Sequence, residues 1–310
     1  MHETIEPDHL VARLRFRHLR LLTELQARGS LRAAAQALSL TQPALSKALT
    51  EIEGAFGFAL FARGARGATP TAQGQVVLRG AALLLQELTH LRAEAAAADH
   101  YGAHIRIGAP PFVAQVYLPE VVARLVQGAA PVRVQLLEER VPALIAALRR
   151  GDLDALVTTF PQQMLAQDGG ALQAIKLFEV QFAVIAPAGH ALARARRTDW
   201  ARLSRQRWVM PGEDSMGRKL IEQCFTQAGV PAPLPVIEST SPTTSIQFVA
   251  AGLGIGIVPD VALLHHGASR DGAVKPVRVA PAPPASAVAL IFREGPRNPR
   301  IALLKEALGL

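Results

Sequence analysis

A short polar stripe near residue 45 is the part of this sequence best suited to recognising another molecule. Four side chains recur there at helical spacing and would share one face of a helix: Pro43, Ser46, Lys47 and Thr50. The stripe is short, polar and carries one cation. A helix of this kind can enter the major groove of DNA, where base edges present hydrogen-bond donors and acceptors.

Two short helices joined by a tight turn would hold this stripe in place. Residues 30–52 have the sequence SLRAAAQALSLTQPALSKALTEI, in which Ser30 can cap the first helix and Thr41 the second. The opposite face of the second helix is apolar and predicts a buried stripe: Leu45, Leu49, Ile52 and Phe56. An ordinary helical hairpin with a solvated face is the alternative, since such hairpins are common.

The basic charge of the chain is concentrated around this hairpin. Residues 11–80 hold ten Lys and Arg against three Glu, a net charge of +7, and the whole chain of 310 residues carries +8. A basic module favours a partner that bears phosphates, because neutralising them releases counterions. The alternative is a basic surface that only keeps the protein soluble.

A β-hairpin with arginines at its tip follows the second helix. Residues 58–61 and 68–70 flank a glycine-containing turn that includes Arg63 and Arg66. Such a wing could lie on the phosphate backbone or reach the minor groove. A basic surface turn with no partner fits the residues equally well.

A long helix is expected from Thr71, its cap, to about Ala98. It carries apolar residues at alternating steps of four and three: Val77, Ala81, Leu84, Leu88, Leu91 and Ala95. This heptad spacing is typical of a helix that pairs with another helix, and we predict that it pairs with a second copy of the chain. Packing of the same residues against the first helices of their own chain is the alternative.

From residue 101 the pattern changes to alternating strands and helices. Strands are expected at residues 104–108, 132–136 and 153–157 with helices between them, the first of these helices at about 113–127. A similar half follows from residue 179. Two such halves predict a clamshell with a ligand at the carboxyl ends of its strands. Residues at these ends make up the predicted effector site: Pro110, Pro111, Phe112, Thr158, Thr159, Ser241 and Thr243. Hydroxyls beside helix N-termini favour an anion, although plain helix capping explains them as well.

Several kinds of chemistry are not supported by the sequence. The single Cys224 lies on an apolar helical face and cannot form an intramolecular disulfide. His265-His266 has no second cluster at metal-ligand spacing, so neither a metal nor a cofactor is expected. Residues 252–256 (GLGIG) follow a helix and precede a strand, the reverse of a dinucleotide fingerprint, so these glycines are expected to permit a tight helix-to-strand turn. Glu138 and Glu139 are adjacent and make no acid/base pair.

No signal peptide or membrane span is visible, which indicates a cytoplasmic protein.

These residues resemble the LysR-type bacterial transcriptional regulators over nearly the whole chain. The resemblance rests on three motifs: TQPALS at Thr41–Ser46, LFAR at Leu60–Arg63 and VAAGLGIGIVP at Val249–Pro259. Lys47 stands where the family frequently has Arg, and the leader before Phe16 is longer than usual. The resemblance implies a winged helix-turn-helix, an effector domain like a type 2 periplasmic binding protein, and a tetramer, and it allows RNA polymerase as a further partner.

The predicted organisation is α/β overall in three parts. Residues 1–73 form the winged helix-turn-helix, 74–100 the linker and dimerisation helix, and 101–310 the effector domain, with subdomain I at about 101–178 plus 276–310 and subdomain II at about 179–275. The predicted DNA-binding set follows from the stripe and the resemblance: Arg32, Thr41, Gln42, Pro43, Ser46, Lys47, Thr50, Arg63 and Arg66.

The predicted function is a DNA-binding transcriptional regulator controlled by a small anionic effector, without catalysis. Its predicted partners are double-stranded operator DNA, further copies of itself and the effector. The competing prediction is a solute-binding or enzymatic α/β protein whose N-terminal helices serve only oligomerisation. The polar outer stripe argues against it, because an oligomerisation hairpin would prefer an apolar face.

Overall fold

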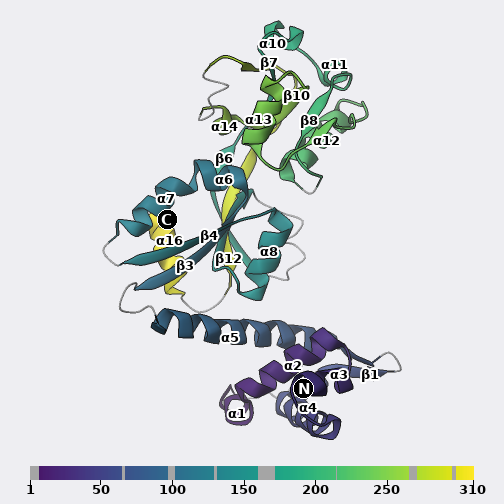
Figure 1. The fold of residues 1–310 in the computed structure, drawn as a ribbon, viewed down its shortest axis with the longest axis vertical. Helices are drawn as coiled ribbons and strands as arrows, with labels where there is room; N and C mark the ends of the chain where they lie inside the picture. Colours follow the sequence, from purple (N-terminus) through teal and green to yellow (C-terminus); the bar gives the residue numbers. More distant parts are fainter. Residues whose placement is uncertain are drawn as a thin grey trace. The chain divides into compact units, whose positions relative to one another are not determined.

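The chain divides into two compact units in a computed structural model. The structure describes residues 7–64, 67–96, 102–128, 131–159, 172–213, 215–264, 271–294 and 298–310. One unit comprises residues 1–98 with 149–152, and the other comprises residues 99–148 with 153–310. Figure 1 follows the elements of each unit along the chain.

The N-terminal unit is helical apart from one β-hairpin. Its elements in chain order are α1 (Pro7–Arg13), α2 (Phe16–Arg28), α3 (Leu31–Ala37), α4 (Gln42–Phe56), β1 (Phe61–Gly64), β2 (Gly67–Pro70) and α5 (Ala72–Ala96). The two helices predicted within residues 30–56 are therefore confirmed as α3 and α4, and the predicted wing is the antiparallel pair β1–β2.

Side-chain caps set the ends of α3 and α4. The Ser30 hydroxyl accepts a hydrogen bond from the Ala33 amide at 3.2 Å, and the Thr41 hydroxyl accepts one from the Ala44 amide at 3.3 Å. Gly57 ends α4 in the left-handed conformation at φ 76°, as a helix-ending glycine does. Leu45, Leu49 and Ile52 are fully buried as predicted, whereas Ala55 rather than Phe56 completes the buried stripe.

Two close approaches of the backbone attach the wing to the helices. The Ala68 amide donates to the Gly29 carbonyl at 3.0 Å, and the Thr71 amide donates to the Leu60 carbonyl at 2.9 Å. A Cβ atom at Gly74 would lie 1.9 Å from the Leu60 carbonyl oxygen, so only glycine allows the first turn of α5 to sit there. The predicted Thr71 cap is confirmed, because its hydroxyl accepts from the Gly74 amide at 2.9 Å.

The second unit contains two five-stranded sheets, each covered by helices. Its strands are β3 (Ala103–Ala109), β4 (Val132–Glu138), β5 (Ala155–Thr159), β6 (Leu172–Val180), β7 (Phe182–Pro187), β8 (Trp208–Met210), β9 (Ile237–Glu238), β10 (Ile255–Pro259), β11 (Val274–Pro276) and β12 (Ser286–Arg293). Its helices are α6 (Pro111–Val116), α7 (Leu118–Val126), α8 (Val141–Arg150), α10 (Ala191–Arg194), α11 (Trp200–Leu203), α12 (Met216–Gln227), α13 (Pro242–Ala250), α14 (Asp260–Leu264) and α16 (Pro299–Leu308).

The two sheets define two subdomains. The strand order is β4-β3-β5-β12-β6 in the first and β11-β7-β10-β8-β9 in the second. The chain crosses once between β6 and β7 and returns before β12, where Ser286 pairs with Val180. The sequence placed the return near residue 276, whereas the Thr198–Val279 bridge keeps the chain beside the second sheet past that point. The α/β clamshell predicted from the βαβ pattern is confirmed.

One predicted helix of this unit is divided in two. A single helix was expected at about residues 113–127, but α6 ends at Val116 and α7 begins at Leu118. Pro119 explains the break, because it has no amide hydrogen to continue the helical ladder. Tyr117, between the two helices, stacks on Phe178 of β6 with ring centroids 4.1 Å apart.

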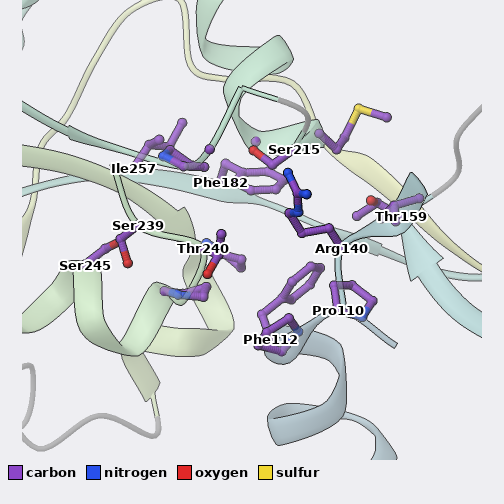
Figure 2. A pocket seen from close by; sticks show the side chains of 18 of the residues that line it. Pro110, Phe112, Arg140, Thr159, Phe182, Ser215, Ser239, Thr240, Ser245 and Ile257 are labelled. Carbon is purple, nitrogen blue, oxygen red and sulfur yellow. The ribbon is translucent and has the colours of Figure 1, made fainter. Parts of the chain in front are cut away.

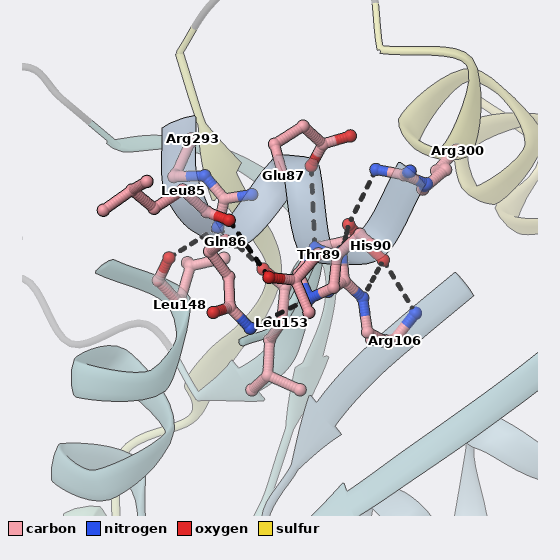
Figure 3. A network of polar contacts seen from close by, with 11 residues as sticks. Leu85, Gln86, Glu87, Thr89, His90, Arg106, Leu148, Leu153, Arg293 and Arg300 are labelled. Carbon is pink, nitrogen blue, oxygen red and sulfur yellow. Dashed lines mark hydrogen bonds and ion pairs between the residues drawn. The ribbon is translucent and has the colours of Figure 1, made fainter. Parts of the chain in front are cut away.

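A buried carboxylate holds the first subdomain together. Asp154 has a fully buried side chain, and its Oδ1 accepts from Arg106 Nη2 at 2.7 Å and from Arg300 Nη1 at 3.5 Å. Its Oδ2 also accepts from the Arg106 backbone amide at 2.9 Å. Arg293 donates to the Leu153 carbonyl at 2.7 Å, and Figure 3 marks these contacts on the three arginines. The network joins β3, the start of β5, β12 and α16.

Among the described residues no helix is long and apolar enough to span a membrane.

Candidate DNA interface and effector cleft

The outer face of α4 is open to solvent. The side chains of Thr41, Gln42, Pro43, Lys47 and Thr50 are exposed, and Ser46 is half-buried. Lys47 and Gln42 make no side-chain hydrogen bond or ion pair within the described part of the chain. The predicted stripe therefore lies opposite the buried Leu45, Leu49 and Ile52, with its donors available to a partner.

Two hydroxyls of the predicted DNA-binding set, those of Thr41 and Thr50, are hydrogen-bonded locally. The Thr50 hydroxyl donates to the Ser46 carbonyl at 3.1 Å, which leaves its oxygen available as an acceptor. The Thr41 hydroxyl caps the helix, so its role at an interface is to fix the start of α4. Arg32 is exposed in the first turn of α3. The described side chains of the predicted set thus come from the adjacent α3 and α4.

The structure describes the two arginines predicted for the wing only in part. Arg63 belongs to β1 and pairs with Ala68 across the hairpin, but its side chain lies outside the described residues. Arg66 lies outside them altogether. The sequence did not predict the bond between Glu53 of α4 and the wing: its Oε1 accepts from the Leu60 amide at 2.8 Å and from the Phe61 amide at 3.2 Å.

The predicted pairing seam on α5 divides into two halves. Val77 is half-buried and Ala81 is buried, and the first half of the helix packs against α2 with Leu78 fully buried. Farther along, the remaining seam residues are all exposed: Leu84, Leu88, Leu91 and Ala95. The alternative of packing within one chain therefore applies to the first half of the helix, and the leucines of the second half remain available to a second helix.

A cavity of about 220 Å³ lies between the two subdomains of the second unit. Its walls are largely apolar, with Phe112 and Pro110 from one subdomain and Phe182 and Ile257 from the other (Figure 2). The described residues that line it are Pro110, Pro111, Phe112, Glu138, Glu139, Arg140, Val141, Thr159, Phe182, Pro211, Gly212, Ser215, Met216, Gly217, Ser239, Thr240, Pro242, Ser245, Ile257 and Pro259.

Four of the seven predicted effector residues line this cavity: Pro110, Pro111, Phe112 and Thr159. Thr158 does not, because successive side chains of β5 point to opposite faces of the sheet. Its hydroxyl is instead fully buried and makes no hydrogen bond with the described residues. Thr159 is 3% exposed and its side chain likewise has no hydrogen-bond partner among them, so its hydroxyl is available within the cavity.

Ser241 and Thr243 also lie outside the lining, although their neighbours Ser239, Thr240 and Ser245 belong to it. The Ser241 hydroxyl caps α13 by accepting from the Thr244 amide at 3.4 Å, as the capping alternative proposed. The Thr243 hydroxyl donates to Oε1 of Gln115 on α6 at 3.1 Å, and this bond joins the two subdomains beside the cavity.

Arg140 is a charged cavity residue that the sequence did not predict. It follows β4 and precedes α8, so it occupies the carboxyl end of a parallel strand, where ligands of α/β sheets bind. Figure 2 shows its side chain reaching from the first subdomain toward Ser215 of the second. Arg140 is the one cation among the described lining residues. The neighbouring Glu138 and Glu139 also line the cavity, and Glu139 accepts from the Arg140 backbone amide at 2.8 Å.

The start of α12 supplies a second polar region to the cavity. Ser215 caps this helix by accepting from the Arg218 amide at 3.1 Å, and Met216 and Gly217 of its first turn line the cavity. A Cβ atom on Gly217 would lie 3.3 Å from Pro211 and 3.4 Å from the Phe182 ring, so this first turn lies directly beside both residues. Unpaired amides at a helix N-terminus favour an anion, as does the guanidinium that faces them.

The residues considered for other chemistry have structural roles where the structure describes them. Cys224 is buried on α12, and burial raises the pKa of its thiol. Gly254 lies in the turn between α13 and β10, where a Cβ atom would be 2.7 Å from the Arg207 carbonyl oxygen, so the expected tight helix-to-strand turn is confirmed. His265 and His266 lie outside the described residues, and no group of three metal-ligating side chains occurs within them.

Comparisons with known proteins cover nearly the whole chain. A family model described as "LysR substrate binding domain" matches residues 98–309, and one described as "Bacterial regulatory helix-turn-helix protein, lysR family" matches residues 16–75. The chain is 30% identical over 244 residues to the HTH-type transcriptional regulator GbpR of Azospirillum brasilense, covering 78% of this chain and 70% of that protein.

Two further matches extend over most of both chains. A probable hydrogen peroxide-inducible genes activator of Mycobacterium avium is 29% identical over 277 residues, covering 89% of this chain and 86% of that one. The solved structure of full-length OxyR C199D from Pseudomonas aeruginosa is 25% identical with a TM-score of 0.62, covering 96% of this chain and 95% of that chain.

Proposed function

Because this chain belongs to the LysR family of transcriptional regulators, we propose that the outer face of α4 selects its DNA site. The chain is a DNA-binding regulator controlled by an effector, and the prediction of a solute-binding or enzymatic protein with a helical oligomerisation module is set aside. The observation that carries the proposal is the exposed polar stripe of α4 opposite its buried apolar stripe. Gln42, Ser46 and Lys47 offer the donors and acceptors that base edges require.

Substitutions in the stripe test this assignment once footprinting upstream of the neighbouring genes has located an operator. Lys47→Ala should weaken binding to that operator by about 1–3 kcal/mol and weaken binding to unrelated DNA much less. Arg32→Ala is the comparison, because an arginine beside the phosphate backbone contributes to binding on every sequence. Equal losses on both DNAs for Lys47→Ala would show that α4 does not read bases.

If the wing touches phosphates, Arg66→Ala should reduce the salt dependence of DNA binding, as should Arg63→Ala.

The effector in this proposal is a small anion with an apolar body, held in the cavity between the subdomains. Arg140 and the first turn of α12 attract its charge, the Thr159 hydroxyl hydrogen-bonds to it, and Phe112, Phe182 and Ile257 pack against its body. When both subdomains contact one ligand, its binding favours the closed clamshell, and closure is the change that would be transmitted to the DNA-binding unit.

A panel of small carboxylates and their matching neutral amides tests the effector class. Binding, followed by calorimetry, should be restricted to carboxylates, and Arg140→Gln should weaken it by about 10- to 100-fold, the cost of a charged hydrogen bond. Thr159→Val removes one hydroxyl at constant shape and should have a smaller effect in the same direction. A preference for amides, or an Arg140→Gln protein that binds carboxylates normally, would exclude an anionic effector at this site.

The same proposal includes assembly through two surfaces of this chain. The exposed leucines of α5 suit a pair of helices, and β4 is an edge strand whose Leu136 and Leu137 are 39% and 41% exposed. Two different self-associating surfaces would build a homotetramer with dihedral symmetry. RNA polymerase remains a further proposed partner, for which the chain offers no specific residue.

A peroxide-sensing function is not favoured, although some relatives are named for peroxide induction. The sequence has one cysteine, so no disulfide can form within a chain. Burial of Cys224 raises its thiol pKa and disfavours the reactive thiolate. The proposed function as a whole involves no metal, cofactor or catalysis. It places the protein in the cytoplasm with its operator DNA.

A further inference from the structure

A dense group of arginines surrounds two short helices of the second subdomain. Residues 190–207 hold six arginines and one acid, a net charge of +5 in 18 residues. We call this group the α10–α11 patch: Arg194, Arg196, Arg197, Arg202, Arg205 and Arg207. Residues 11–80 carry +7 and the whole chain +8, so everything outside these two segments sums to −4. The net positive charge of the chain therefore comes from these two segments.

All six arginines are exposed and none is neutralised by an acid of the described chain. Asp199 is the one acid in the segment, and its carboxylate is used as a helix cap that accepts from the Arg202 amide at 2.8 Å. Arg278 adds a further exposed cation, because its carbonyl pairs with the Thr198 amide at 2.9 Å in the middle of the segment. Within the described chain, the patch is thus a concentration of unpaired guanidinium groups.

The backbone beneath the patch is firmly anchored. The Trp200 ring packs edge-on against Phe225 at 5.1 Å, and its indole N–H donates to the Pro281 carbonyl at 2.9 Å. Trp208 packs on the same Phe225 and donates to the Leu203 carbonyl at 2.8 Å. Figure 1 shows α10 and α11 at the same end of the second subdomain, away from α6, whose first residues Pro111 and Phe112 line the cavity. A partner at this end would therefore not compete with the effector.

The chemistry of the patch suits a phosphate backbone better than a protein surface. Protein interfaces bury aromatic and apolar residues in a core from which charge is depleted. Here the aromatic and large aliphatic side chains of the segment are all buried, namely Leu192, Trp200 and Leu203, as is the adjacent Trp208. The exposed groups of the segment are mainly guanidinium groups. A guanidinium binds a phosphate through a pair of hydrogen bonds, whatever the base sequence of the nucleic acid.

We infer that the α10–α11 patch is a second DNA-contacting surface that binds the phosphate backbone without reading sequence. It adds to the contacts of the helix-turn-helix and lies on the effector-binding unit. A regulator with contacts on both units can hold a longer stretch of DNA than its recognition helices cover.

The salt dependence of DNA binding tests this inference on the full-length protein. The probe is a mixed-sequence duplex of about 60 base pairs, and affinity is measured over a range of NaCl concentrations. Arg194→Gln/Arg197→Gln/Arg202→Gln should reduce the slope of log affinity against log salt by about 0.9 for each phosphate that is no longer neutralised, hence by up to about 2.7. The same three positions changed to Lys should largely keep the slope, because counterion release depends on charge.

The matched control removes three exposed cations elsewhere on the same unit: Arg133→Gln/Lys219→Gln/Lys275→Gln. It should leave the slope nearly unchanged. An unchanged slope in the patch variant would overturn the inference and leave an acidic protein as the occupant of the patch. An equal reduction in the control would overturn it too, because the effect would then belong to the overall charge.

Discussion

The carboxylate of Glu53 accepts a hydrogen bond from the backbone amide of Leu60, at 2.8 Å between Oε1 and N. The same oxygen accepts from the Phe61 amide at 3.2 Å. Glu53 belongs to α4 and Leu60 directly precedes β1, so one side chain attaches the recognition helix to the wing. Any DNA contacts of α4 and of the wing are therefore held in a set relation by an acid within a basic module.

Removing this carboxylate should destabilise the DNA-binding unit. Glu53→Ala leaves two partly buried amides without an acceptor, and we expect a loss of about 2 kcal/mol in the free energy of unfolding, measured by urea denaturation. Glu51→Ala is the matched control, since Glu51 is exposed on the same helix and makes no side-chain hydrogen bond or ion pair within the described residues. Equal effects of the two substitutions would mean that the Glu53 bonds contribute nothing.

The approach of α5 to the wing depends on a single glycine. At Gly74 an added methyl would overlap the Leu60 carbonyl oxygen, and because that atom is backbone the helix itself must move. Gly74→Ala should therefore cost about 3 kcal/mol or more in the free energy of unfolding. Gly54→Ala in α4 has open space around the new methyl and should be neutral or stabilising by up to about 1 kcal/mol. A Gly74→Ala protein of normal stability would contradict the close approach.

The exposed leucines of α5 should control self-association. Leu88→Asp places a charge in the proposed helix pair and should shift the protein toward monomers in sedimentation measurements at micromolar concentration. Val76→Asp introduces the same charge at a site on α5 that is 59% exposed but lies outside the seam, and it should leave the association state unaltered. If the two variants behave alike, the seam is not the interface.

Stability of the DNA-binding unit should fall in mild acid because of His18. Its burial, together with the nearby Arg17 and Arg15, lowers its pKa from the ordinary 6.5, against a smaller opposing effect of Glu51. Below about pH 6.5 the unfolded chain binds a proton that the folded chain does not, so folding loses free energy as the pH falls toward the lowered pKa. His18 makes no contribution of this kind at pH values well above the ordinary pKa.

Replacing the imidazole should remove that component of the pH dependence. His18→Leu, followed by urea denaturation from about pH 8 to about pH 5, should lose less stability on acidification than the unmodified protein. The Nδ1 atom of His18 is buried without a partner within the described residues, so the substitution removes no hydrogen bond at that atom. Parallel pH profiles for the two proteins would show that His18 is not the responsible group.

Local patterns in the sequence were sufficient for α3 and α4, their caps and the polar face of α4, although they did not show the break between α6 and α7. Ser30, Thr41, Gly57 and Thr71 each act on backbone groups within a few residues, so their roles follow from types and spacing alone. The apolar stripe of α4 likewise determines which side is buried, and hence which side is offered to DNA. The βαβ pattern determined the fold class of the second unit in the same way.

Contacts between distant residues were decided only by the tertiary structure. Glu53 and Arg140 looked like ordinary surface charges, because the amides of the wing and the opposite wall of the cavity come from other parts of the chain. Thr158 and Thr159 were equal candidates until the pleat of β5 assigned one to the sheet interior and the other to the cavity. Sequence spacing determines which side of an element a residue occupies, whereas packing determines what that side meets.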